Sequence, residues 1–309
     1  MKQYFLKTYI LIILIIIPIN KSYSDIFIVA KVNQEIITNV DLDFEKRYLV
    51  SLNPNLKKLD QNRITEYAKN SLINEKIKRI EIEKKFRIVP NESLLSKVIG
   101  DIYSGIGSSS LNEFKMYLSE NAVDFQRVKE KISIEIAWND LVVKTFSNEI
   151  EIDENFMREE IEKFDEKNIE NLLISEIIFT VNDKNELQAK YEEIQKSINE
   201  IGFEETARIY SLSDSRKGGG NLGWIYKNQL SQEIKDGLNE ISIGDYTNPI
   251  ITSGGFLILK LNDMKREKIA IDKDAQLQRM IEFERERQFT RFSTLYYKRI
   301  YNNAEINEK

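Results

Sequence analysis

The chain has 309 residues, with 45 lysines and arginines, 50 aspartates and glutamates, and neither histidine nor cysteine. The lack of cysteine excludes disulfides, thiol catalysis and iron–sulfur clusters, and the lack of histidine excludes serine–histidine nucleophilic centres and histidine-ligated metals. A formal net charge of −5 gives no reason to expect nucleic acid as a partner. Binding, or catalysis without a protein nucleophile, fits this composition best.

Residues 1–24 have the pattern of a secretory signal peptide. Two lysines precede an apolar run over 9–19, and small residues follow at Ser22 and Ser24. The run is shorter than the roughly 20 apolar residues that a membrane-spanning helix needs, so we expect cleavage before Asp25. An uncleaved anchor is the alternative, and only through it would the protein meet the membrane. The prediction is export to a bacterial periplasm.

The next region, 25–169, is predicted to be mostly helical. It opens with a β-branched-rich strand over 25–32, and Thr38 and Asp41 have the spacing of a capping box that would begin a helix. Apolar positions in 60–86 recur at three- and four-residue steps, which is typical of a long amphipathic helix. Shorter helices are expected over 91–103, 111–119, 124–147 and 153–164.

The pattern changes over 170–266, where short strands, short helices and turns alternate. Strands are predicted over 172–179, 249–251 and 255–261, and helices over 184–201, 203–210 and 231–238. Glycines dominate 218–224, which we interpret as a tight turn because no strand–GxGxxG–helix unit or Walker lysine surrounds it. Nucleotide binding is therefore not expected.

The last region, 267–309, returns to helical periodicity. Leu277, Ile281 and Tyr296 belong to one apolar stripe that predicts a long helix. A short final strand is expected at 304–306. Ordinary core packing is the simplest interpretation of such a stripe.

Residues 219–224, Gly-Gly-Asn-Leu-Gly-Trp, resemble the Gly-Gly-Asp-Leu-Gly-Trp motif of parvulin-type peptidyl-prolyl isomerase domains. Other pieces follow in the order of that family: Ser-Glu-Ile-Ile at 175–178, Leu-x-x-Ile-x-Ile-Gly-Asp at 238–245 and Gly-Phe-Leu-Ile-Leu-Lys-Leu at 255–261. The resemblance extends over 170–266.

The flanking regions resemble the SurA-like periplasmic chaperones, through the stretch 28–41 and through the order of the segments. The resemblance implies an α+β fold, in which 25–169 and a C-terminal helix within 267–309 form one mostly helical module. A single parvulin domain, a small antiparallel sheet flanked by helices, would be inserted between them. It also implies unfolded or extended polypeptides as partners, outer-membrane β-barrel precursors above all, with no cofactor and no metal.

The site positions that the resemblance implies depart from those of active parvulins. Glu176 and Leu257 take the places of two histidines that face each other across the site. The central polar position falls at Asp214, or at Ser213 because the loop here is one residue shorter. Leu257 has no hydrogen-bonding group, and Glu176 donates a hydrogen bond only if burial raises its pKa enough to keep it protonated.

The candidate catalytic residues are therefore Asp214 and Glu176, for which a solvated surface position is the alternative. The candidate substrate-binding residues are Leu230, Ile234, Phe256, Leu257 and Trp224, and core packing is the alternative for the first three. We expect polypeptide binding with weak or lost isomerase activity. Two other functions stay open: an active isomerase with a histidine-free site, and a membrane-tethered relative whose parvulin domain serves for docking.

Overall fold

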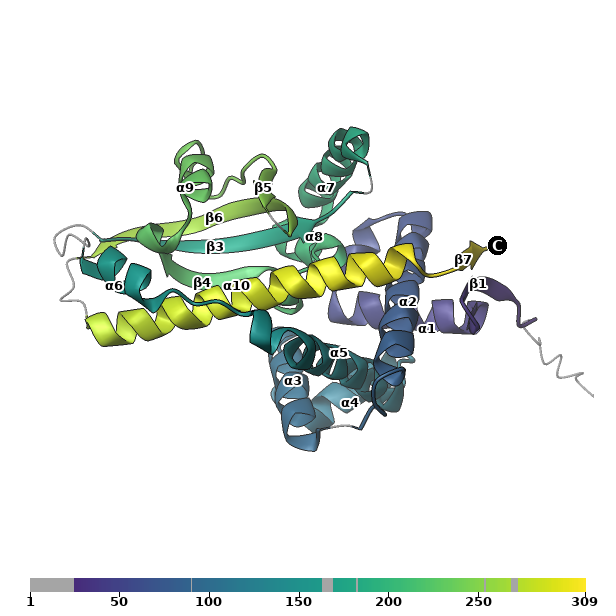
Figure 1. The fold of residues 1–309 in the computed structure, drawn as a ribbon. Coiled ribbons are helices and arrows are strands. Elements are labelled where there is room, and N and C mark those ends of the chain that lie inside the picture. The colour runs from purple at the N-terminus through teal and green to yellow at the C-terminus, as the bar shows by residue number, and fades with distance from the viewer. Residues whose placement is uncertain (1–24, 90, 163–168, 182, 253, 268–271) are drawn as a thin grey trace, which may run out of the picture.

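The computed structural model describes residues 25–89, 91–162, 169–181, 183–252, 254–267 and 272–309 (Figure 1). The predicted signal peptide lies outside these residues. Among the helices of the described ranges, none is both long and apolar enough to span a bilayer. The described chain forms a helical module, built from 25–162 and 272–309, and a sheet domain, built from 169–267.

The helical module begins with two strands, β1 (Ile28–Val32) and β2 (Glu35–Thr38). Six helices follow: α1 (Asn39–Leu52), α2 (Gln61–Glu83), α3 (Glu92–Gly105), α4 (Leu111–Glu120), α5 (Phe125–Phe146) and α6 (Glu154–Glu162). The predicted capping box is confirmed, because the Thr38 hydroxyl accepts from the Asp41 backbone N–H and the Asp41 carboxylate accepts from that of Thr38. Asp60 and Asp124 cap α2 and α5 without a capping box, each accepting a backbone N–H of the first turn.

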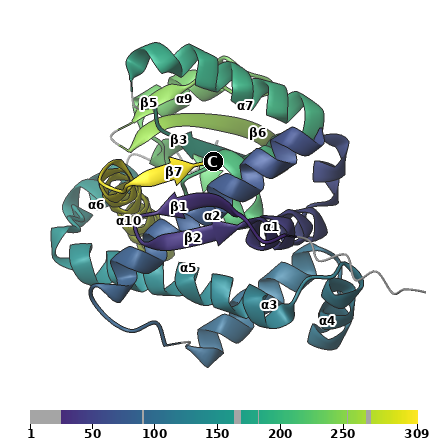
Figure 2. The same cartoon turned by 90° about the vertical axis from the view of Figure 1, so that its right-hand side faces the viewer.

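The C-terminal part completes this module. Helix α10 (Lys273–Asn302) packs against α2, α5 and α6, and β7 (Ile306–Glu308) joins β1 as the third strand of an antiparallel sheet, β2-β1-β7 (Figure 2). At the centre of the contact Tyr296 stacks on Trp138 with ring centroids 5.4 Å apart, and the indole N–H donates to the Ser293 hydroxyl. Helix α10 therefore lies against the N-terminal helices within one helical module.

The sheet domain has four antiparallel strands in the order β4-β3-β6-β5. Its elements are β3 (Ile169–Phe179), α7 (Leu187–Ile201), α8 (Phe203–Tyr210), β4 (Asn221–Tyr226), α9 (Gln232–Asn239), β5 (Ile250–Thr252) and β6 (Gly255–Glu267). Helices α7 and α8 cover Ile177 and Phe179 on one face, while α9 contributes Leu238 to the apolar cluster of the other face. The α+β fold expected from the sequence is confirmed.

Short 3₁₀ helices connect several elements, at Pro54–Lys58, Ser147–Glu149, Lys184–Glu186, Asp214–Gly218 and Lys227–Gln229. The sheet domain meets the helical module at α2, where the hydroxyls of Tyr67 and Tyr210 lie 2.8 Å apart. Ile64 and Ile201 belong to one apolar cluster beside this contact. The two parts of the chain thus share a packed interface.

Strand β3 begins at Ile169 and not at 172, and the final strand is β7 at 306–308 and not at 304–306. Strands β4 and β6 differ most from the prediction. The sequence indicates a turn over 218–224, but the turn ends at Gly220 and β4 begins at Asn221. The glycines conceal this strand, because Gly223 lies within it at a positive φ of 74° beside a bulge in the β3–β4 ladder. Strand β6 also continues beyond the predicted end at 261, since its polar second half stays paired with β3 as far as Glu267.

Candidate functional site

A buried carboxylate lies at the centre of the predicted site. Glu176 is in β3, and its backbone N–H donates to the carbonyl oxygen of Gly220 over 2.8 Å. Its side chain is buried and accepts hydrogen bonds from the hydroxyls of Ser213, at 2.5 Å, and Ser215, at 2.8 Å. The carboxylate therefore holds the 3₁₀ turn between α8 and β4 against β3, and Glu176 is not a solvated surface acid.

Burial raises the pKa of the Glu176 carboxyl above its ordinary value, and the two serine hydroxyls offset part of that shift. Among the described residues, no lysine or arginine forms an ion pair with this carboxyl. The shift has the direction that Glu176 would need to act as a hydrogen-bond donor. When the carboxyl is ionised it accepts hydrogen bonds instead, as it does here from the hydroxyls of Ser213 and Ser215.

Glycines allow the turn to approach β3 this closely. Gly220 has a φ of 80°, and a Cβ atom at this position would lie 2.2 Å from the carbonyl oxygen of Glu176. Gly219, with a φ of 70°, ends the 3₁₀ turn in the left-handed region. The Gly-Gly pair thus has a steric role, and any side chain at 220 would push the turn off the strand.

Three of the predicted substrate-binding residues share one apolar cluster next to this carboxylate. Leu230 and Leu257 are each 5% exposed, and the half-buried Ile234 packs against the same cluster. Leu257 is opposite Ile178 in the β3–β6 ladder, and strand alternation places Glu176 on that same side of the sheet. The structure therefore brings these three residues and Glu176 to one face.

The other two predicted substrate-binding residues lie on the opposite face. Phe256 packs with the cluster beneath α7 and α8, where its ring centroid is 5.5 Å from that of Phe179. Trp224 is 41% exposed and lies beside Ile225, which points into the Leu257 cluster. The Lys265 ammonium is 4.5 Å from the centroid of the Trp224 ring. These two aromatic residues are therefore separated from the carboxylate by the sheet.

Asp214, the other candidate catalytic residue, is half-exposed and pairs with Lys217 at 3.7 Å. The hydroxyls that reach Glu176 come from its two neighbours, Ser213 and Ser215. The sequence offered Ser213 as an alternative but gave no reason to select Ser215. Within the described ranges no group of three or more acidic side chains is placed to hold a metal ion.

The C-terminal helix covers part of the apolar face. Phe283 of α10 packs against the cluster that contains Leu230 and Leu257. Farther along the helix, a Cβ atom on Gly254 in the β5–β6 turn would lie 3.7 Å from the Cα atom of Arg291. Figure 1 shows α10 running along the whole sheet domain. The apolar cluster is thus largely a closed core, shared between the sheet domain and the helical module.

The turn that holds the serines is also fixed to the helical module. Arg216 donates to Glu135 of α5 at 3.2 Å, and Lys78 of α2 donates to both oxygens of the same carboxylate at 2.9 and 2.8 Å. Burial alone would raise the pKa of Glu135, but Lys78 and Arg216 outweigh it and hold that pKa well below its usual range. We call these three residues the Glu135 triad. No local sequence pattern indicates it.

Residues 172–263 match the family model of the PPIC-type PPIase domain, and this segment contains every predicted site residue. The chain is 22% identical over 301 residues to chaperone SurA of Pseudomonas aeruginosa, which is 91% of this chain and 70% of that protein. It is 24% identical over 205 residues to chaperone SurA of Pseudomonas putida, and spans 46% of that relative's length. A solved structure of one of two SurA-like chaperones of Campylobacter jejuni, PEB4 and Cj1289, aligns with 91% of this chain and 98% of its own, at 17% identity and a TM-score of 0.36.

Proposed function

Since the chain is a SurA-like protein with a PpiC-type peptidyl-prolyl isomerase domain, we propose that it is a periplasmic chaperone that binds unfolded polypeptides and has weak or no isomerase activity. The observation that carries the proposal is the composition of the site face. Its apolar residues are retained, while Glu176 is engaged by two serines and Leu257 lies in a closed core.

The energetics of prolyl isomerisation support low activity. The barrier of ~18–20 kcal/mol comes from amide resonance, and an isomerase lowers it by hydrogen bonds to the twisted amide and by an apolar pocket for the ring. Leu257 offers no hydrogen bond, and Glu176 already accepts from Ser213 and Ser215. The twisted amide is uncharged, so two missing hydrogen bonds, at about 0.5–1.5 kcal/mol each, would reduce the rate by roughly 5- to 150-fold.

The proposed clients are unfolded outer-membrane β-barrel precursors, by the resemblance to SurA. Binding would need no nucleotide, since the apolar and charged surfaces of the helical module act by equilibrium association alone. The predicted signal peptide would deliver the chain to the compartment through which these precursors pass.

The test uses one preparation of residues 25–309 in two assays. An unfolded barrel protein is diluted from urea and its light scattering is followed, and isomerisation of a proline peptide is followed separately. We expect suppressed aggregation near equimolar chaperone, with no isomerisation above background. The chaperone function would be refuted if the barrel protein aggregates as fast with a tenfold molar excess of the chain as it does without the chain.

An active isomerase is the second candidate, and the Glu176 hydrogen-bond network favours it because a polar group stays at the edge of the apolar face. On this hypothesis the proline peptide isomerises well above background, and Glu176→Gln reduces the rate. Leu230→Ala changes the apolar cluster and leaves Glu176 in place. Comparing the two variants would separate binding of the proline ring from the role of the carboxyl.

A further inference from the structure

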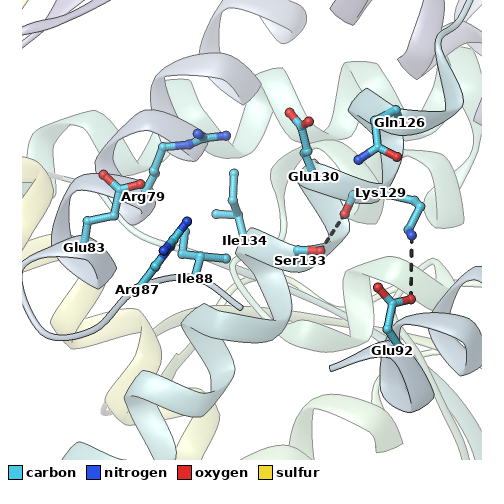
Figure 3. Close-up of a pocket in the computed structure, with 10 residues that line it drawn as sticks. All are labelled: Arg79, Glu83, Arg87, Ile88, Glu92, Gln126, Lys129, Glu130, Ser133 and Ile134. Carbon is cyan, nitrogen blue, oxygen red and sulfur yellow. Dashed lines mark hydrogen bonds and ion pairs between the residues drawn. The ribbon is translucent and has the colours of Figure 1, made fainter. Parts of the chain in front are cut away.

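A cavity of about 540 Å³ lies in the helical module, away from the sheet domain (Figure 3). Ile88 and Ile134 give it an apolar wall, and two arginines, Arg79 on α2 and Arg87 beyond its end, line it as well. A second cavity of about 180 Å³ shares Arg79 with it and extends the space toward Ile37 of β2. Glu130 lines both cavities as well, and we call the space that they occupy between α2 and α5 the trough.

The two arginines differ from the other cations of this trough. The Nε atom of Arg79 is buried and has no hydrogen-bond partner among the described residues, and neither Arg79 nor Arg87 forms an ion pair there. The other cations pair with acids of the chain: Lys76 with Glu35, Arg127 with Asp41, Lys129 with Glu92, and Lys131 with Glu45 and Glu75. A buried donor without an acceptor is costly to the folded state. A ligand in the cavity would meet the part of the Arg79 guanidinium that lines it, together with Arg87.

The chemistry of the wall limits the ligand. A guanidinium matches the two oxygens of a carboxylate in its planar fork. Glu83 and Glu130 are exposed on the same wall, where a carboxylate is able to accept a hydrogen bond from a backbone N–H of a bound polypeptide. An extended polypeptide carries both groups at once, and its apolar side chains fit the two isoleucines.

We propose that the trough between α2 and α5 binds a carboxylate-bearing segment of an extended polypeptide, with Arg79 and Arg87 as the carboxylate-binding pair. The inference rests on the proposed function in one respect, that polypeptides are the ligands. The carboxylate comes either from an acidic side chain or from the C-terminus of the bound chain. Both sources supply a carboxylate, and they are distinguished by which form of a test peptide binds.

The test is fluorescence anisotropy with one apolar octapeptide in four forms: a free C-terminus, a C-terminal amide, and amides with an internal Glu or Gln. Residues 25–309 are compared with Arg79→Gln/Arg87→Gln. The matched control is Lys84→Gln/Lys85→Gln, which removes the same charge from the neighbouring turn outside the cavity lining. Thermal unfolding of the single variant Arg79→Gln is measured in parallel.

We expect the arginine variant to lose about tenfold or more in affinity for a carboxylate form, while the amide and Gln forms and the lysine control are unaffected. The single variant should unfold at the same temperature as the parent or a higher one, because an orphaned buried donor is removed. Equal affinity of the parent for all four forms, or an equal loss in the control, would overturn the inference. If the inference is overturned but the parent still suppresses aggregation, the proposed chaperone function is kept without this carboxylate site. If the parent binds no peptide and does not suppress aggregation, the chaperone function and the carboxylate site are both refuted.

Discussion

Replacing Glu135 with glutamine should destabilise the protein more than an ordinary surface substitution. Lys78 is 7% exposed and makes two hydrogen bonds to this carboxylate, so the variant leaves a buried ammonium without its counter-ion. Breaking a fully buried pair costs about 3–5 kcal/mol. The Glu135 side chain keeps 24% exposure, and water will therefore offset part of this cost. We expect a loss of about 2–3 kcal/mol in the free energy of unfolding.

Urea unfolding followed by tryptophan fluorescence measures this loss. Trp138 suits the purpose because its ring centroid is 5.6 Å from the Lys78 ammonium, and Trp224→Phe removes the other tryptophan. A double-mutant cycle with Lys78→Met should give a coupling free energy above about 1 kcal/mol. Additivity within about 0.5 kcal/mol would refute the argument.

The same pair predicts a pH dependence. The pKa of Glu135 is held below its ordinary value of 4.5 in the folded state. Its contribution to stability is therefore complete above that pH and is lost as the pH falls through the lower folded value. The Glu135→Gln variant should converge with the parent in acid, when unfolding is measured at matched ionic strength.

Three further results are expected. Glu176→Gln should stabilise the protein at neutral pH, because the raised pKa of this carboxyl makes the parent lose stability as the pH rises above the ordinary 4.5, and the gain should vanish below it in urea titrations. Gly220→Ala should cost about 3–5 kcal/mol by thermal unfolding, from its φ and its contact with the Glu176 carbonyl, and Gly223→Ala, in open space, only about 1–2. Tyr296→Ala should cost about 3–5 kcal/mol by circular dichroism, since it empties the contact with Trp138.

Each of these results has a contrary outcome. A Glu176→Gln variant that is less stable at every pH would mean that the ionised form is the one the two serines stabilise. Equal costs at Gly220 and Gly223 would remove the steric argument for the turn. A Tyr296→Ala variant with unchanged helicity and midpoint would show that α10 does not hold the helical module together.

The sequence was sufficient for most elements, because their patterns are local. Capping at Thr38 and the periodicity of α2 need only neighbouring residues. Strand β4 was not predicted because glycine lowers the strand propensity of this segment. Its pairing with β3, a contact between distant residues, holds it as a strand. In the site, Phe256 and Leu257 were grouped through their family positions. Adjacent strand residues point to opposite faces, and strand alternation alone would have separated them.

The remaining features depend on contacts between distant segments. Nothing in the local sequence connects Arg216 with Glu135, or singles out Arg79 among the many basic residues of the helical module. Ser215 resembles any polar turn residue until the turn is folded against Glu176. Charge pairing and burial of this kind are set by the tertiary structure, so the chain alone predicts the elements more readily than their polar connections.

The pairing of β7 with β1 also imposes an order on the assembly of the chain. Asn33 and Glu305, which exchange hydrogen bonds at this junction, are 272 positions apart. The β3–β6 ladder closes within 169–267, so this domain is able to form while the chain is still being delivered. Strand β1, in contrast, keeps an open edge until residues 306–308 arrive, and long-range closure of this kind is slow. An interrupted chain would therefore present that edge to strands of other proteins.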